Sequence, residues 1–271
     1  MADVAMRYEE LNSLKLWRTM ATITLDEMRG VKLMNRVDTK YVMTTAEALE
    51  LVERGAERGY RVQTIGDVRA ARYDTLYYDT AERAMYVAHH NQQLTRQKIR
   101  TRHYVESGAT FLEIKNKSNR GRTRKRRVAI APQLFEEFRG DAAAMAHYAE
   151  YGWYDAERLS PALSTRFVRI TLVNSELTER LTIDLDLRYC DVRSGREAHI
   201  DNMAIVELKQ DGLAESVAKQ MLQDMRIQPC KVSKYCLGTS LTVADIKRNR
   251  YKEKLRTIEL RLKRGMPTAR E

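Results

Sequence analysis

The densest group of chemically capable side chains lies in RQKIRTRHYVESGATFLEIKNKSNRGRTRKRRV, from Arg96 to Val128, where twelve Lys and Arg residues face only Glu106 and Glu113. Such a run can be a disordered tail, a nucleic-acid patch or a solvated face. Apolar residues, Ile99 and Leu112 among them, interrupt the charges at regular spacing, which is not typical of disordered tracts. We therefore expect a folded region that concentrates positive charge for an anionic partner.

The charges alternate along two predicted strands, at about residues 95–106 and 110–117. Successive side chains of a strand face opposite sides, so one face carries Arg96, Lys98, Arg100 and Arg102 and, on the second strand, Glu113, Lys115 and Lys117. The short SGAT turn predicts a hairpin that lays these two charged faces side by side. His103 falls on the other face, where we expect a structural role.

Further strands show the same alternation. Their charged faces carry Arg36, Asp38 and Lys40; Lys125 and Arg127; Arg169; Arg180, Asp184, Asp186 and Arg188; and Glu207 and Lys209. If all these strands belong to one closed sheet, the charges line its lumen, where unpaired buried cations cost several kcal/mol each. A bound polyanion would supply the counter-charge. Glu207 and Glu113 could hold a divalent metal that bridges phosphate oxygens, or form ordinary Glu–Lys cross-strand pairs.

The elements that must position these residues follow from periodicity and turn residues. We predict strands at about 35–43, 71–78, 95–106, 110–117, 122–130, 167–174, 180–186 and 203–209. Eight strands suffice to close a barrel. Predicted helices lie at 46–59 with Thr45 as N-cap, 132–138, 142–151, 212–225 and 244–264. The last is amphipathic and is expected to pack on the domain, with a basic face that leaves membrane contact open.

Composition bounds the class of protein. The chain of 271 residues is 43% hydrophobic and carries a net charge of +11, and no linker divides it, so we expect one domain over 1–271 with an anionic partner. Without a secretory signal or a transmembrane segment, it is expected to be soluble and cytoplasmic. Three cysteines without a CxxC pair predict buried thiols and neither disulfides nor a zinc site.

Short segments in order along the chain resemble a known family. They are LMNRVDTKYVM, YDTLYYDT, KIRTRHY, FLEIKNK, RKRRVAI, RITLVNSELTERLTID, IVELK and KVSKYCLG, between Leu33 and Gly238. The chain is similar to the polyphosphate polymerase domain of the vacuolar transporter chaperone (VTC) complex and its bacterial relatives, in the triphosphate tunnel metalloenzyme superfamily. This resemblance implies an α+β fold in which helices flank an eight-stranded antiparallel tunnel barrel. It also implies ATP as phosphoryl donor to polyphosphate, with Mn²⁺ or Mg²⁺.

The same resemblance assigns roles to residues. Catalytic phosphate contacts are implied for Lys40, Arg100, Arg102, Lys115, Lys125, Arg127, Arg169, Arg180, Lys231 and Lys234. Glu207 resembles the metal-binding glutamate, and Glu113 is a second candidate ligand. Five more cations are expected to contact the nucleotide and its phosphates: Arg36, Lys98, Lys117, Arg188 and Lys209. Alternation selects the same residues independently, apart from Lys231 and Lys234 of KVSKY.

One departure from the superfamily narrows the function. The first strand reads RVDTK where hydrolases and cyclases carry ExExK, which favours the polymerase branch. Three alternatives stay open: a tripolyphosphatase, nucleoside triphosphatase or cyclase, a polyphosphate-binding module without turnover, and nucleic-acid binding through residues 120–127 and the C-terminal helix. We expect ATP and polyphosphate as partners and no specific nucleic acid, with room for peripheral contact with a membrane protein. The sequence leaves the oligomeric state open.

Overall fold

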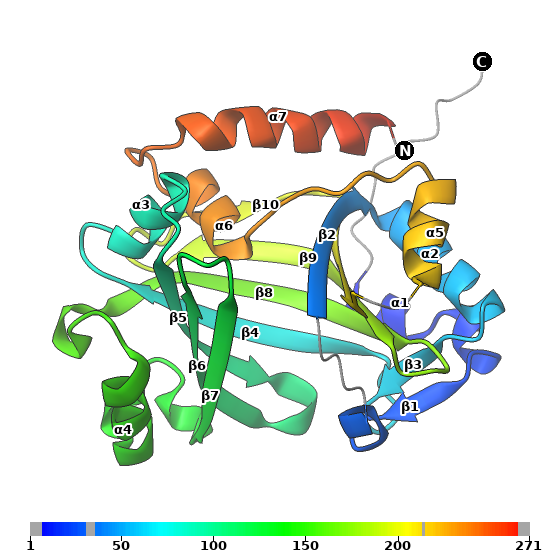
Figure 1. The fold of residues 1–271 in the computed structure, drawn as a ribbon, viewed down its shortest axis with the longest axis horizontal. Coiled ribbons are helices and arrows are strands. Elements are labelled where there is room, and N and C mark those ends of the chain that lie inside the picture. Colours follow the sequence, from blue (N-terminus) through cyan, green and yellow to red (C-terminus); the bar gives the residue numbers. More distant parts are fainter. Residues whose placement is uncertain (1–6, 31–35, 213–214, 265–271) are drawn as a thin grey trace.

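The computed structural model describes residues 7–30, 36–212 and 215–264, and its centre is one strongly curved sheet (Figure 1). In the described ranges the sheet has 11 strands, and its main path runs β2-β11-β9-β8-β4-β5-β6-β7 with antiparallel neighbours. The path comprises β2 (Arg36–Thr44), β4 (Ala70–Asp79), β5 (Arg96–Tyr104), β6 (Ala109–Lys117), β7 (Thr123–Ile130), β8 (Ser160–Val173), β9 (Glu179–Asp191) and β11 (Met203–Asp211). The short strands β1 (Thr22–Thr24), β3 (Arg61–Thr64) and β10 (Glu197–His199) lie off this path.

The predicted α+β class is confirmed, but the closed barrel is wrong in detail. The path ends at β2 and β7, and the two strands do not pair with each other in the described part of the chain. Strand β7 carries exposed cations at Arg124, Lys125 and Arg127. Charged side chains of this kind are typical of edge strands, because they disfavour pairing with another strand.

Helices cover both faces of the sheet. They are α1 (Tyr8–Asn12), α2 (Thr45–Glu57), α3 (Ala84–His90), α4 (Ala142–Tyr151), α5 (Val217–Asp224), α6 (Lys234–Thr242) and α7 (Asn249–Arg264), with 3-10 turns at Lys15–Arg18, Glu27–Gly30, Val105–Ser107, Pro132–Leu134, Phe138–Gly140 and Ala156–Arg158. The convex face packs against α2 and α5 in one apolar cluster and against α4 in another. The concave face packs against α6 and α7 at one end of the strands. No helix in the described ranges is both long and apolar enough to cross a lipid bilayer.

Four helix predictions need correction. Two helices begin five residues later than predicted: α5 at Val217 instead of 212, and α7 at Asn249 instead of 244. The N-cap of α2 is Thr44, one residue before the predicted Thr45, because the hydroxyl of Thr44 accepts from the backbone N–H of Glu47. The predicted helix over 132–138 is a pair of 3-10 turns instead. Two side chains of the sheet hydrogen-bond to the backbone of this segment. The hydroxyls of Tyr78 and Thr101 donate to the carbonyl of Phe135 at 3.1 and 2.5 Å, a carbonyl that a continuous helix would use within itself.

Strand β8 begins seven residues before its predicted start, and β9 ends five residues after its predicted end. A β-bulge explains both differences. The pairing register between β8 and β9 shifts between Arg166 and Val168, and Asp186 has a φ of +48°. The bulge reverses the alternation of side chains, so a period-2 pattern read from the sequence stops there. Leu185 consequently belongs to the convex cluster and Leu187 to the concave one.

Candidate functional site

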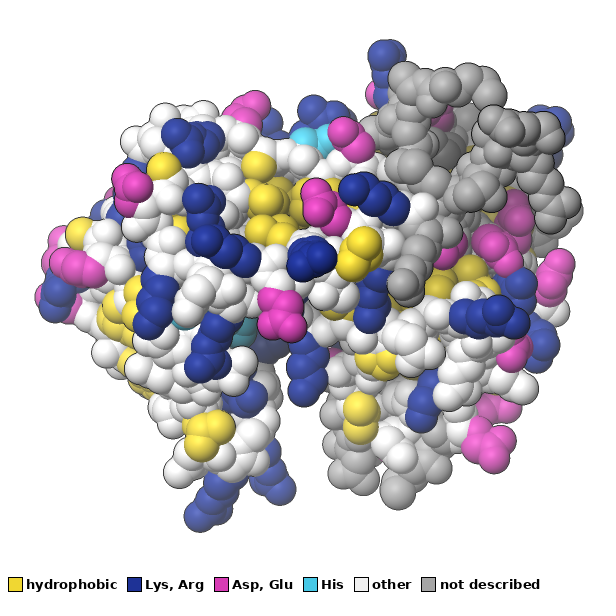
Figure 2. All heavy atoms as spheres, turned by 90° about the horizontal axis from the view of Figure 1, so that it is seen from above, with side chains coloured by type: hydrophobic (Ala, Val, Ile, Leu, Met, Phe, Trp, Pro, Cys, Tyr) yellow, Lys and Arg dark blue, Asp and Glu magenta, His cyan; other side chains and the backbone are white. Residues whose placement is uncertain are grey.

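The concave face beside α6 carries the charged side chains that alternation selected. They come from seven of the eight long strands: Lys40 on β2, Lys98, Arg100 and Arg102 on β5, Glu113 and Lys115 on β6, Lys125 on β7, Arg169 on β8, Asp184 on β9, and Glu207 and Lys209 on β11. Lys234 on α6 joins them. In Figure 2 the surface is deeply notched, and Lys and Arg side chains lie on both sides of the notch. Three carboxylates organise the cations, and two of them, Glu113 and Asp184, are buried.

The first carboxylate, Glu113, lies between β5 and β7 and is 1% exposed. Its Oε2 atom accepts from Nε of Arg100 at 2.7 Å, and its Oε1 atom lies 2.5 Å from Nζ of Lys125. Burial opposes ionisation of Glu113, but Arg100, Arg102 and Lys125 outweigh it and hold the pKa of Glu113 well below its usual range. Glu113 is therefore a fixed negative charge that orients two cations.

The second carboxylate is Asp184 on β9, also 1% exposed. Arg169 grips it with both branches of its fork, Nε to Oδ1 at 2.5 Å and Nη2 to Oδ2 at 2.8 Å, and Lys234 contacts Oδ2 as well. Burial opposes ionisation, but Arg169 and Lys234 hold the pKa of Asp184 low. Alternation puts Asp184 on the charged face, yet sequence reasoning gave it no role in the site.

The third carboxylate is Glu207 on β11, which faces Lys40 across the β2–β11 pairing. Its Oε2 atom also lies 3.1 Å from Nζ of Lys209. Loss of water around Glu207 alone would raise its pKa, but the positive charges of Lys209 and Lys40 outweigh that effect. The pKa of Glu207 is therefore well below its usual range. Each of the three carboxylates is thus held between two cations.

Other cations on this face have no carboxylate partner. Arg102 is 5% exposed, its Nε donates to Oγ1 of Thr75 at 3.0 Å, and it forms no ion pair with any described residue. Lys98 donates to Oγ of Ser233 at 2.8 Å, and Lys115 makes no hydrogen bond or ion pair within the described ranges. Positive charge therefore exceeds negative charge on the concave face, which favours an anion of several charges.

The excess charge changes the basicity of three lysines. Partial loss of water around the ammonium group, with repulsion from Arg100 and Arg102, lowers the pKa of Lys125 to about 7, although its side chain is 39% exposed. Partial desolvation and nearby cations lower the pKa of exposed Lys115 to about 8 and that of half-buried Lys209 to about 8. These ammonium groups would regain full charge on contact with phosphate oxygens, because an anion within reach favours the protonated form.

The remaining predicted cations lie at the margins. Arg127 is exposed and its guanidinium lies 4.5 Å from the ring of Phe111. Lys117 lies opposite Arg96 in the β5–β6 pairing. The positive charge of Arg96, together with partial desolvation and the charge of exposed Lys231, lowers the pKa of Lys117.

Two more predicted cations lie near the edges of the sheet. Arg180 lies next to Lys209 in the β9–β11 pairing. Arg36 begins β2, and its side chain lies outside the described residues.

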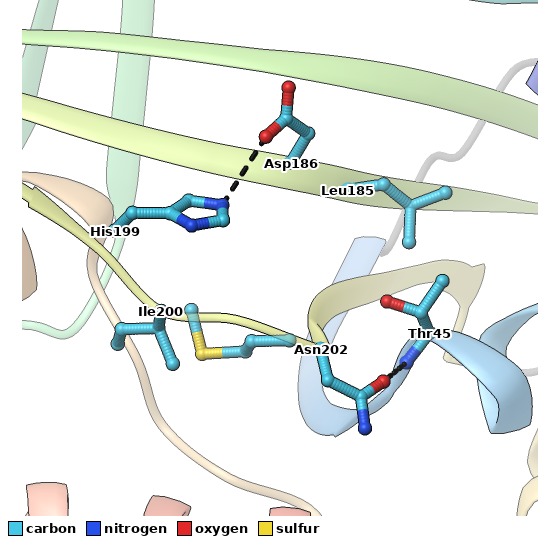
Figure 3. A pocket seen from close by; sticks show the side chains of 7 residues that line it. Thr45, Leu185, Asp186, His199, Ile200 and Asn202 are labelled. Carbon is cyan, nitrogen blue, oxygen red and sulfur yellow. Dashed lines mark hydrogen bonds and ion pairs between the residues drawn. The ribbon is translucent and has the colours of Figure 1, made fainter. Parts of the chain in front are cut away.

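Arg188 lies apart from this group, contrary to the prediction. The bulge at Asp186 turns Leu187 and Tyr189 toward the concave cluster, so Arg188 faces the other way. Its side chain is 63% exposed, and its Nε lies 3.1 Å from Oδ1 of Asp186. Figure 3 shows Asp186 facing His199, at 3.2 Å, beside a small pocket. Sequence alternation could not detect the reversal.

A resident metal centre does not fit the carboxylates of this face. Among the described residues, no group of three or more His, Cys, Asp or Glu side chains could hold an ion. Glu207 and Glu113, the predicted ligands, are each engaged by two cations. Magnesium often binds through only one or two carboxylates together with substrate phosphates, so these residues suit an ion that arrives with a phosphate ligand.

Comparison with solved structures gives the fold. The chain resembles the Hippeastrum protein HpAC1, described as a candidate adenylyl cyclase with a dominant triphosphatase activity, at 14% identity and a TM-score of 0.50, covering 78% of this chain and 98% of that one. A candidate adenylate cyclase from Bacillus halodurans matches at 12% identity and a TM-score of 0.49, covering 74% and 96%. At this level of identity, the likeness to HpAC1 shows a shared fold and nothing more. No curated protein matched the sequence.

The sequence comparison is more specific. The family model described as the VTC domain matches residues 35–243, which span β2 to the end of α6 and therefore the whole concave face. The chain thus belongs to the VTC domain family.

Proposed function

We propose that the concave face binds linear polyphosphate and that the protein extends it by transferring the terminal phosphate of ATP. The observation that carries this proposal is Arg102, a buried guanidinium with no carboxylate partner among the described residues. The three nearby carboxylates are each already engaged by two cations. The described cations of this face outnumber its carboxylates, and buried charge without a counter-charge is costly, so the imbalance favours an anion supplied from outside. Membership of the VTC domain family supports the same function.

The proposed roles follow from side-chain chemistry. The planar forks of Arg100, Arg102 and Arg169 can each grip two phosphate oxygens, whereas a lysine offers a point charge. The proposed phosphate-binding set is Lys40, Arg100, Arg102, Lys115, Lys125, Arg127, Arg169, Arg180, Lys231 and Lys234, with Lys98, Lys117 and Lys209 beside it. Glu113, Asp184 and Glu207 fix the directions of their partners, so little reorganisation is needed when substrate binds.

The transfer itself asks mainly for alignment and neutralisation of charge. A terminal oxygen of the polyphosphate attacks the γ-phosphorus of ATP, a new P–O–P bridge forms, and the bond to the β-phosphate breaks to release ADP. The attacking oxygen is already ionised, so no general base is required. A divalent cation, Mn²⁺ or Mg²⁺, would neutralise phosphate charge when bound, and Glu207 is the residue we propose to hold it.

Hydrolysis is the second candidate, because the structural neighbour HpAC1 is described as having a dominant triphosphatase activity. In that case water takes the place of the polyphosphate oxygen and orthophosphate is released. The same concave face would bind the triphosphate in both reactions. The products, and not the site, distinguish the two.

The experiment is to incubate the protein with ATP, Mn²⁺ and a short polyphosphate primer, resolve the products by gel and measure ADP. Lengthening ladders with equivalent ADP support the polymerase. Orthophosphate without ladders supports the hydrolase, and binding without consumption of ATP indicates a module without turnover. Substitution of Arg169 by Ala should reduce this activity, and Arg166→Ala is its matched control. Arg166 lies on β8 like Arg169, but its side chain is 73% exposed and lies near Asp74.

A further inference from the structure

The first turn of α6 is tied to three strands by three consecutive residues. Ser233, the N-cap of α6, accepts from Nζ of Lys98 on β5 at 2.8 Å. Lys234 contacts Asp184 on β9. The hydroxyl of Tyr235 donates to Asp79 at the end of β4. The first two contacts involve cations of the concave face, whereas the contact between Tyr235 and Asp79 does not. The Tyr235–Asp79 contact can therefore fix the position of α6 without itself binding an anion.

Asp79 is a rigid acceptor for this contact. Its side chain is fully buried, and Oδ1 accepts from the backbone N–H groups of Thr80 at 2.8 Å and Met85 at 2.9 Å. Oδ2 accepts from the N–H of Tyr86 at 3.0 Å in addition to the hydroxyl of Tyr235. Both carboxylate oxygens are therefore fixed by the start of α3, whose first N–H groups have no partners within the helix.

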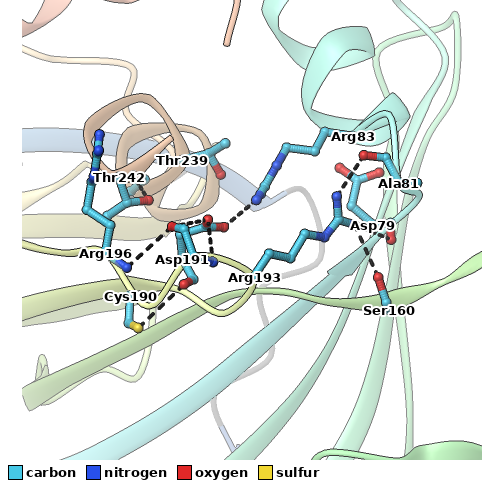
Figure 4. Close-up of polar contacts among 12 residues, drawn as sticks. Asp79, Ala81, Arg83, Ser160, Cys190, Asp191, Arg193, Arg196, Thr239 and Thr242 are labelled. Atoms are coloured by element: carbon cyan, nitrogen blue, oxygen red, sulfur yellow. Dashed lines mark hydrogen bonds and ion pairs between the residues drawn. The ribbon is translucent and has the colours of Figure 1, made fainter. Parts of the chain in front are cut away.

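A second set of contacts fixes the loop that follows Asp79, as Figure 4 shows. Arg83 forms a buried ion pair with Asp191 at the end of β9. Arg193 donates to the carbonyls of Ala81 and Thr80, each at 2.7 Å. The loop therefore cannot move without breaking contacts to the end of β9, the strand that carries Asp184, and to Arg193 just beyond it.

We propose that Asp79 and Tyr235 form a clamp that holds α6 against the sheet and thereby positions Lys234 in the phosphate-binding face. Lysine has a long flexible stem, so the location of its ammonium group depends on where its backbone is anchored. Lys234 is the first residue of α6, and the clamp acts on the very next residue. Asp79 and Tyr235 are thus positioning residues that touch no substrate. The inference rests on the proposed function only for the identity of the anion.

The test compares Tyr235→Phe with Tyr86→Phe, which is a matched control. Both tyrosines are buried in the same apolar cluster and each donates one hydroxyl hydrogen bond, but that of Tyr86 goes to the carbonyl of Lys247, away from Lys234. Binding of inorganic tripolyphosphate is measured by calorimetry. We expect Tyr235→Phe to weaken binding by about three- to tenfold, as the loss of one hydrogen bond allows, and Tyr86→Phe to leave it unchanged.

A double-variant cycle separates positioning from general loosening. If Tyr235 acts through Lys234, Tyr235→Phe should add nothing to the loss already caused by Lys234→Gln. Additive losses, or an equal effect of Tyr86→Phe, would overturn the clamp.

Hydrogen exchange in the ligand-free protein gives an independent readout. We expect the first-turn amides of α6 to exchange faster in Tyr235→Phe and the amides of α2 to be unaffected; unchanged α6 exchange would also overturn the clamp. A wild-type protein that binds no tripolyphosphate would refute the proposed function instead, while the exchange data would still decide the clamp.

Discussion

Arg102 is the most deeply buried of the described concave-face cations that have no carboxylate partner. Its removal should separate function from stability. In Arg102→Met, an apolar side chain of similar length replaces a buried charge without a carboxylate partner among the described residues, so the free energy of unfolding should hold steady or rise. The kcat/KM for polyphosphate extension should also fall. The loss of transition-state stabilisation should be about 2 to 4 kcal/mol, which is the range for a preorganised electrostatic group.

The measurement pairs urea unfolding with steady-state kinetics, and Arg166→Ala serves as the exposed control on β8. A variant that loses stability in step with activity would show that Arg102 is structural. Retained activity in a folded Arg102→Met protein would remove Arg102 from the site.

The lysines of lowered pKa predict proton uptake on binding. Lys125 has a pKa of about 7, and Lys115 and Lys209 have pKa values of about 8, so at pH 8 all three are partly neutral. Bound phosphate raises each pKa, and the complex should take up about one to two protons at pH 8 and far fewer at pH 6. Affinity should accordingly weaken as pH rises from 6 to 9.

Calorimetry in two buffers of different ionisation enthalpy counts these protons directly. Lys125→Met should lower the uptake near pH 7.5 by the largest single share, since its pKa is the lowest of the three. Zero uptake at pH 8 in the wild-type protein would contradict the proposed contacts.

Alternation in the sequence was sufficient to find most of the charged face, because side-chain direction in a strand depends only on residue parity. It misplaced Arg188, since the bulge at Asp186 changes parity without any glycine or proline to mark it. It also left Asp184 without a role. A carboxylate that orients cations and one that binds a metal look alike in sequence, and only the contacts of Asp184 with Arg169 and Lys234 distinguish them.

At the scale of elements, Glu113 joins three strands, since it lies on β6 and contacts Arg100 on β5 and Lys125 on β7. Glu113→Gln leaves Arg100 and Lys125 without their partner. Because water partly screens Lys125, whose side chain is 39% exposed, we expect the free energy of unfolding to fall by about 1 to 3 kcal/mol. Thermal and urea unfolding measure this loss. Burial alone would raise the pKa of Glu113, but its cation partners outweigh burial and lower the pKa in the folded state. The contribution of Glu113 to the free energy of unfolding is therefore present above the pKa of the unfolded state, and it is lost as pH falls through the pKa of the folded state.

The control for this prediction is Glu50→Gln on α2. Glu50 pairs with Arg54 four residues later, and both side chains are at least 40% exposed, so this substitution should cost no more than about 0.5 kcal/mol. Equal losses in the two variants would show that burial of Glu113 adds nothing. Tripolyphosphate should stabilise Glu113→Gln less than the wild type if Arg100 and Lys125 lose their orientation.

Elements with a clear period were predicted and elements without one were missed. The amphipathic helix α7 was predicted through to its last residue, Arg264, although it begins five residues later than expected. Helix α6 was missed because the segment KYCLGTSLT is buried on nearly every side and shows no amphipathic period. Only the structure reveals that this unpredicted helix carries Lys234 into the site.

For the whole molecule, closure of the sheet was beyond sequence reasoning. Whether a sheet closes depends on the twist and stagger summed over every strand, not on any one residue. Eight predicted strands were therefore compatible with both a closed barrel and the open path from β2 to β7. Within the described residues β2 and β7 stay unpaired, and Figure 2 shows a deep notch in the surface with Lys and Arg side chains on both sides of it.

This arrangement predicts which polyanion the protein selects. Exposed cations at Arg120, Arg122 and Arg124 and on α7 offer any polyanion a weak outer surface. The concave face instead holds more cations than carboxylates at fixed positions, which we expect to favour the closely spaced phosphates of polyphosphate. Polyphosphate at a concentration of about 100 times its Kd should add about 2.7 kcal/mol to the free energy of unfolding and so raise Tm by several degrees. DNA with the same number of phosphates should raise Tm little.

Arg102→Met should abolish the polyphosphate shift and leave weak DNA binding intact, because Arg102 is buried on the concave face and does not reach the outer surface. Differential scanning fluorimetry at two salt concentrations tests this directly. Counterion release makes outer-surface binding fall steeply with salt, while ion pairs in a partly buried site are screened less. Equal shifts from DNA and polyphosphate, both lost at higher salt, would instead mean that net charge alone, and not the organised concave face, governs what this protein binds.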